Sequence, residues 1–210
     1  MASHQGRTPR TKCTGRDARD EAGAPGADVR GAQGATDPDP DPETRARQIC
    51  LRLLTLAPRT RAQLATALRD RGVPGDAARA VLDRFADVGL IDDAAFARAW
   101  VESRHYSRGL AGRALRAELK QRGVDDDQIR DAIEDLGPDA EVATARRLVE
   151  RKLASTRGLP SDARIRRLAG TLARKGYPAS LAFRVVKEAL EAEGAQVEES
   201  CFDELDTYTD

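Results

Sequence analysis

The nine residues LATALRDRG at positions 64–72 recur twice, as LRAELKQRG at 115–123 and as LAGTLARKG at 168–176. In each copy, two leucines stand eight and four residues before a glycine, and an arginine or a lysine directly precedes that glycine. Leucines four residues apart lie on one face of a helix, and glycine adopts the left-handed conformation that ends many helices. The stretch therefore predicts one helix, ended by glycine, that is repeated three times.

The likeness extends beyond the three glycines. Pairs of aliphatic residues follow nine and ten positions later, at 81–82, 132–133 and 185–186, and a longer helical pattern precedes the second and third copies. From Glu43 onward apolar residues recur at spacings of three and four, without a long β-branched alternation. Self-similarity of this kind is typical of repeat proteins, in which each unit packs against its neighbour. We predict an all-α fold of three tandem three-helix repeats that form an elongated, curved rod.

The predicted repeats span residues 44–88, 92–136 and 139–190. Residues 1–42 are rich in Gly, Ala, Pro, Arg and Asp, and they bury too little apolar surface to offset the entropy of ordering the chain. We predict a disordered tail there, and a second, acidic tail over residues 193–210.

The overall charge balance conceals an uneven distribution. The chain has 35 basic and 35 acidic residues, but residues 191–210 hold eight acidic residues and no basic one. Residues 1–43 hold six basic and eight acidic residues, which leaves 29 basic and 19 acidic residues in the helical body, residues 44–190. That body has a net charge of +10, so an anionic partner is compatible with the neutral total.

Several classes of protein are disfavoured by what the sequence lacks. No stretch free of charged residues exceeds eight residues, whereas a membrane-spanning helix needs about 20 apolar residues. The N-terminal stretch also lacks the apolar run of a secretory signal, so we expect a cytoplasmic protein without membrane contact. The three cysteines, Cys13, Cys50 and Cys201, fit neither a disulfide framework nor a zinc site.

The motifs of common enzymes are also missing. The two histidines, His4 and His105, have no second metal ligand at a suitable spacing, and neither a phosphate-binding glycine loop nor a Gly-x-Ser-x-Gly turn occurs. The acidic stretches at 92–93 and 125–127 precede helices, where carboxylates cap free N–H groups more often than they bind ions. We predict a protein that is not an enzyme and that needs no cofactor or metal.

Candidate contact residues lie on two basic helix stripes. Arg113, Arg116 and Lys120 share one face of the second repeat, and the third repeat carries a similar arginine stripe. An ordinary solvated face is the alternative for any single arginine, whereas the recurrence of a nearly acid-free stripe favours contact with phosphates. The candidates for contact with a partner or nucleic acid are Arg104, Arg108, Arg113, Arg116, Lys120, Arg164, Arg167 and Arg174.

Reading of a base sequence is disfavoured. The chain contains no Asn, and no helix carries the Asn, Gln and Arg cluster that reads base edges in the major groove. Aromatic residues are too few for a platform that stacks single-stranded bases, and we expect Phe96 and Trp100 to belong to the core. The expected partner is therefore recognised by shape or by its backbone.

A distinctive order of turn, cap and core residues comprises GLIDDAAFARAWVESR at 89–104, Gly109, Leu115, ELK at 118–120 and GV at 123–124. This order resembles the RecX family of recombination regulators, and the likeness covers residues 44–190. Most of these residues are structural, because glycines end helices, Asp92 caps one, and Phe96 and Leu119 pack. The resemblance identifies a fold more readily than it locates a site.

The resemblance implies a cytoplasmic protein of recombination, DNA repair and the SOS response. Such a protein binds the RecA recombinase, lies in the groove of its nucleoprotein filament, and restrains ATP hydrolysis, strand exchange and filament growth. We expect a monomer whose own contact with DNA is weak and independent of sequence. The alternative is a helical DNA-binding protein that acts independently of RecA.

Overall fold

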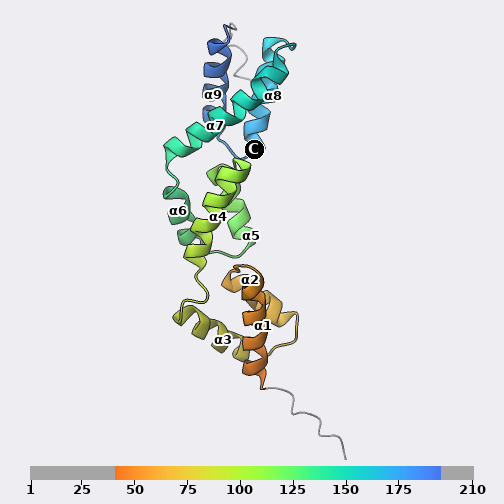
Figure 1. Cartoon of the computed structure of the whole chain (residues 1–210), viewed down its shortest axis with the longest axis vertical. Coiled ribbons are helices and arrows are strands. Elements are labelled where there is room, and N and C mark those ends of the chain that lie inside the picture. Colours follow the sequence, from red (N-terminus) through yellow and green to blue (C-terminus); the bar gives the residue numbers. More distant parts are fainter. Residues whose placement is uncertain (1–40, 195–210) are drawn as a thin grey trace, which may run out of the picture. The chain divides into compact units, whose positions relative to one another are not determined.

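The computed structural model describes residues 41–194, which form α-helices and one short 3-10 turn without any β-strand in that range (Figure 1). The elements are α1 (Pro42–Leu56), α2 (Arg61–Arg69), α3 (Gly75–Asp87), α4 (Asp93–Arg108), α5 (Gly112–Gln121), α6 (Asp126–Glu134), α7 (Pro138–Leu153), the turn η1 (Ala154–Thr156), α8 (Ser161–Ala173) and α9 (Ala179–Ala192). The predicted all-α class is confirmed. Both predicted tails lie almost entirely outside the described residues.

The helices group into three units, α1–α3, α4–α6 and α7–α9, each with its own cluster of buried apolar side chains. The paired leucines of the repeated stretch are at the centre of these clusters, and each is at most 1% exposed. The three glycines that follow them have φ values of +70°, +74° and +87°, which is the left-handed conformation expected at a helix end. The three-helix repeat is therefore confirmed, and the curved rod stays a prediction.

Local signals in the sequence place most helix starts. Thr60 and Gln63 form the capping box at the start of α2, and the Asp92 side chain accepts from the backbone N–H of Ala95, at 2.7 Å, at the start of α4. The first helix starts slightly before the predicted repeat, at Pro42, where the Asp41 side chain caps it, and its last residue, Leu56, is 74% exposed.

The second helices of successive units meet end to end. The Thr60 hydroxyl, at the start of α2, donates a hydrogen bond of 2.6 Å to the carbonyl of Arg122 at the end of α5. The same relation recurs one unit later, where the backbone N–H of Ala111 donates to the carbonyl of Lys175 at 2.9 Å. The positive end of one helix dipole thus meets the negative end of the next, which is a favourable arrangement.

A carboxylate from the following unit completes each of these junctions. The Asp93 side chain on α4 accepts from the backbone N–H of Arg61 at 2.9 Å, and Glu141 on α7 accepts from that of Gly112 at 2.5 Å. Each carboxylate therefore caps a helix in the neighbouring unit, whereas the sequence places Asp93 at the start of its own helix. Burial at this junction raises the pKa of Asp93, and the hydrogen bond from Arg61 opposes that shift.

Candidate functional site

A basic groove lies between α5 of the second unit and the hairpin of α8 and α9 in the third unit. It has a volume of about 520 Å³, and its lining includes Arg113 from α5, Arg166 from α8 and Arg174, which directly follows α8. The junction described above positions these elements, because α5 begins where α8 ends. We call this the α5–α8 groove.

Small residues from both helices form the floor of the groove. Ala114 and Ala117 contribute from α5, and Ala169, Gly170 and Ala173 contribute from α8. On α8 these three residues stand between Arg166 and Arg174 at spacings that keep all five on one helix face. The result is an apolar surface with guanidinium groups at its edges.

The charged side chains that line the groove are all positive. All three of its arginines are exposed, and no acidic residue belongs to its described lining. Two aromatic residues, Tyr177 and Phe183, complete the wall. Burial raises the pKa of Tyr177 to about 12, with a further contribution from the negative charge of Glu141, so its hydroxyl stays neutral at physiological pH. The groove therefore suits a partner that is both acidic and partly apolar.

The predicted contact residues divide between this groove and other parts of the surface. Arg113 and Arg174, predicted on separate stripes, come together in the groove. Arg108, Arg116 and Arg167 are exposed, and none of them forms an ion pair within residues 41–194. Lys120 is also exposed but forms an ion pair with Asp126 at 3.0 Å, which partly compensates its charge.

Arg104 belongs to a cluster around Trp100 on the second unit. Its guanidinium carbon lies 4.1 Å from the centroid of the Trp100 ring, and that of Arg122 lies at 3.7 Å. Glu118 accepts from the indole N–H at 2.8 Å and lies 3.8 Å from the Arg104 guanidinium. The cluster gives Arg104 a structural role through cation–π contacts.

The aromatic residues of this cluster differ from the expectation. The Phe96 and Trp100 rings stack with centroids 5.7 Å apart, but both are only half-buried and pack against the edge of the core. Their placement in the core is therefore only partly correct, and the guanidinium groups of Arg104 and Arg122 lie over the indole ring of Trp100.

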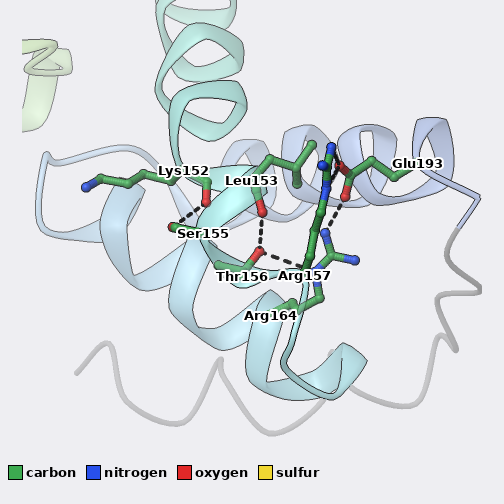
Figure 2. A network of polar contacts seen from close by, with 7 residues as sticks. All are labelled: Lys152, Leu153, Ser155, Thr156, Arg157, Arg164 and Glu193. Carbon is green, nitrogen blue, oxygen red and sulfur yellow. Dashed lines mark hydrogen bonds and ion pairs between the residues drawn. The ribbon is translucent and has the colours of Figure 1, made fainter.

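The predicted exposed position of Arg164 is wrong. Its side chain is buried and donates hydrogen bonds to the carboxylate of Glu193 and to the Thr156 hydroxyl, as Figure 2 shows. Arg157 also donates to Glu193, at 2.8 and 3.0 Å, and the two guanidiniums lower the pKa of that carboxyl. Arg164 therefore fastens the end of α9 to the start of α8 and is removed from the contact surface. Glu193, placed in the acidic tail by the sequence, belongs to the folded unit.

His105 also has a structural environment. It is fully buried between α4 and α7, where Nδ1 donates to the carbonyl of Leu110 at 2.9 Å. Its Nε2 lies 2.8 Å from the hydroxyl of Thr144, which donates to it in that tautomer. Within the described residues no group of three or more His, Cys, Asp or Glu side chains could hold a metal ion. No helix in that range is both long and apolar enough to cross a membrane.

Comparison with known proteins gives the same three units. Residues 46–85 match the first three-helix domain of RecX, residues 92–133 match the second, and residues 139–186 match the third. The chain belongs to the RecX family. Its relatives in that family are named as regulatory proteins.

Individual RecX proteins resemble the chain over most of its length. Regulatory protein RecX of Thermobifida fusca is 60% identical over 168 residues, which cover 80% of this chain and 91% of that protein. RecX of Streptomyces coelicolor is 59% identical over 162 residues, covering 77% and 86%. The crystal structure of RecX from Lactobacillus salivarius has a TM-score of 0.67 at 19% identity and covers 70% of this chain and 96% of that one. At that identity the structural likeness bears on the fold alone.

One groove residue escaped the sequence prediction. Arg166 was not a candidate, because the stripe was drawn through Arg164, Arg167 and Arg174. The sequence pattern that could have revealed Arg166 is a helix face with an arginine at each end and only small residues between them. Small residues on a helix face leave room for a neighbouring element. The face consists of Arg166, Ala169, Gly170, Ala173 and Arg174. The α5 residues that complete the groove belong to another unit, and the sequence alone does not place them there.

Proposed function

We propose that this protein binds the RecA recombinase filament and restrains its ATP hydrolysis, strand exchange and extension. Membership in the family of RecX regulatory proteins is the observation that carries the proposal. The basic α5–α8 groove and the exposed arginines beside it supply a surface on which an acidic partner can be held. Regulation by binding needs no catalytic group, so no reaction is assigned to the protein.

The proposed contact combines protein and nucleic acid. Exposed Arg116 and Arg167 can reach phosphates as Arg side chains commonly do, while the groove provides an apolar floor that a nucleic-acid backbone does not require. We assign the groove to a protein surface and the outer arginines to weak contact with DNA that is independent of sequence. The protein would act as a monomer in the cytoplasm, where RecA filaments form.

A titration of RecA activity tests the proposal directly. Increasing amounts of the full chain are added to RecA on single-stranded DNA, and ATP hydrolysis and strand exchange are followed. We expect inhibition that becomes complete at or below stoichiometric amounts. Unchanged RecA activity at a molar excess of the chain would overturn the proposal.

A second measurement separates the alternative function. The salt dependence of binding to naked duplex DNA reports how many phosphates are contacted, and competition between duplexes reports site preference. Weak binding without a preferred sequence agrees with a regulator that acts on the filament. Tight binding with a clear site preference would instead favour a DNA-binding protein that acts independently of RecA.

A further inference from the structure

The α5–α8 groove has properties that define its occupant. Its floor is built from alanine and glycine, and its edges carry Arg113, Arg166 and Arg174 without an acidic residue in the described lining. The hydroxyl of Tyr177, one of its lining residues, has no hydrogen-bond partner among the described residues. A fitting occupant has apolar side chains toward the floor and carboxylates toward the rim.

The C-terminal segment of this chain has that chemistry. Residues 195–210 contain six acidic residues and no basic one. Four of its apolar residues follow one another at spacings of four, four and three, which would place them on one face of a helix. The acidic residues at 199, 203, 206 and 210 have similar spacings and would lie on the opposite face of that helix. The apolar stripe comprises Val197, Cys201, Leu205 and Tyr208, whereas Phe202 lies off it, and Glu198 and Glu204 fall on its side of the pattern. The segment therefore combines an apolar stripe with an acidic one.

The chain connects this segment to the groove over a short distance. The groove includes Phe183 near the start of α9, and α9 ends at Ala192, about 14 Å further along its axis at 1.5 Å per residue. Glu193 is fixed by Arg157 and Arg164, and Gly194 has a φ of +79°, which turns the chain out of the helix. Seven extended residues span about 23 Å, so position 202 and those after it can reach the groove.

We infer that residues 202–210, connected by the linker at 195–201, occupy the α5–α8 groove, with Leu205 and Tyr208 on the alanine floor and the neighbouring carboxylates against Arg113, Arg166 and Arg174. The bound segment covers the surface that we assign to the acidic partner, so the partner and the segment compete for one site. This regulatory consequence rests on the proposed function, whereas the contact itself does not.

Paramagnetic broadening in the full-length chain tests the contact without RecA. A Cys13→Ser variant leaves Cys201 as the accessible thiol for a nitroxide label, because Cys50 is fully buried. We expect the label to broaden the amide signals of the groove floor, at Ala117, Ala169 and Ala173, beyond those of α1 to α3. The broadening should decrease at high ionic strength, because the rim contacts are exposed ion pairs.

Matched charge reversals assign the broadening to the groove. Arg166→Glu with Arg174→Glu should relieve the broadening of the floor signals. Arg47→Glu with Arg84→Glu makes the same change of charge at exposed positions of the first unit and should leave it unchanged. Broadening that is absent, that lies on another face, or that survives the groove variant would overturn the inference.

A mixed sample distinguishes the chain's own segment from that of a second copy. Spin-labelled protein without isotope is added to isotope-labelled protein without the nitroxide. Broadening of the groove signals in this mixture would show that the segment binds another molecule, which overturns the intramolecular contact. Because RecA is absent from both samples, the result does not depend on the proposed function.

Discussion

Gly176 packs directly against Ala114, so that a Cβ at position 176 would lie 2.6 Å from the backbone nitrogen of Ala114. Its φ of +87° is also one that a side chain disfavours. Gly72 occupies the equivalent position of the first unit with a φ of +70°, but nothing lies within 4 Å of its Cβ position. Both glycines end a helix, and only Gly176 also permits the contact between two units.

Alanine at these two positions separates the helix end from the junction. Gly72→Ala should lower the free energy of unfolding by about 1 kcal/mol, the approximate cost of a left-handed alanine. Gly176→Ala should lower it by about 2–4 kcal/mol, because overpacking against Ala114 adds about 1–3 kcal/mol. Urea unfolding followed by circular dichroism measures both. An equal decrease in the free energy of unfolding in the two variants would mean that the junction accommodates the added Cβ without an energetic penalty.

The buried position of Arg164 predicts a large effect of its removal. Arg164→Ala removes a buried guanidinium with hydrogen bonds to Glu193 and Thr156, and should lower the free energy of unfolding by about 2 kcal/mol, as is typical for hydrogen bonds of a charged group. Arg167→Ala, three residues along the same helix, should change it by less than about 0.5 kcal/mol, because that side chain is exposed. The same urea titration compares them, and a similar loss in both variants would contradict the placement of Arg164.

The Glu193 carboxyl predicts a specific dependence of stability on pH. Because Arg164 and Arg157 lower its pKa, the folded state binds a proton less readily than the unfolded state. Its stabilisation is therefore present above the ordinary glutamate pKa of about 4.3 and is lost as the pH falls through the lowered pKa. Glu193→Gln should lower the melting temperature at pH 7, and the difference from the parent protein should shrink below about pH 4.

The exposed carboxylate of Glu102 provides the control for this prediction. Glu102→Gln removes an exposed carboxylate that forms no ion pair within the described residues, so its melting temperature should follow that of the parent at each pH. Melting curves between pH 3 and 7 provide the comparison. A Glu193→Gln variant whose deficit persists undiminished at the acid end would show that the ion pairs are not the cause.

The sequence predicted those features that depend on neighbours along the chain. The leucine spacing and the glycines placed three helix ends, and Thr60 with Gln63 placed a helix start, because each of these signals acts within one turn. Features that depend on distant residues were missed. Arg164 was assigned to the surface because its partner, Glu193, is 29 residues away, and Asp93 was assigned to its own helix because the N–H that it caps belongs to another unit.

In the candidate site, too, the features set by neighbouring residues could be predicted and those set by distant residues could not. The exposed face of α5 could be predicted from Leu115 and Leu119, which fix the opposite face in the core. The groove could not, because it requires α8 and α9 of one unit to be placed against α5 of another, and that placement depends on the contact of Gly176 with Ala114. Helical repeats make the unit predictable from its period, whereas the surface between two units depends on the junction.

Under the proposed function, the exposed arginines of α5 should determine how strongly the protein inhibits RecA. Arg113→Glu with Arg116→Glu should raise the concentration needed for half-inhibition about tenfold, because each exposed charge contact contributes about 0.2–1 kcal/mol and reversal replaces attraction with repulsion. Lys120→Glu should have a smaller effect, since Lys120 is already paired with Asp126. Inhibition of RecA ATP hydrolysis on single-stranded DNA is the measurement.

The matched control for these charge reversals is Arg47→Glu with Arg84→Glu, which changes the net charge equally on the exposed surface of the first unit. Circular dichroism checks that helicity is retained in every variant. Inhibition that weakens equally in the α5 variant and in this control would indicate a general effect of net charge, because long-range electrostatic attraction does not depend on which face carries the arginine. Inhibition that is unchanged in the α5 variant would show that its basic face is an ordinary solvated helix surface.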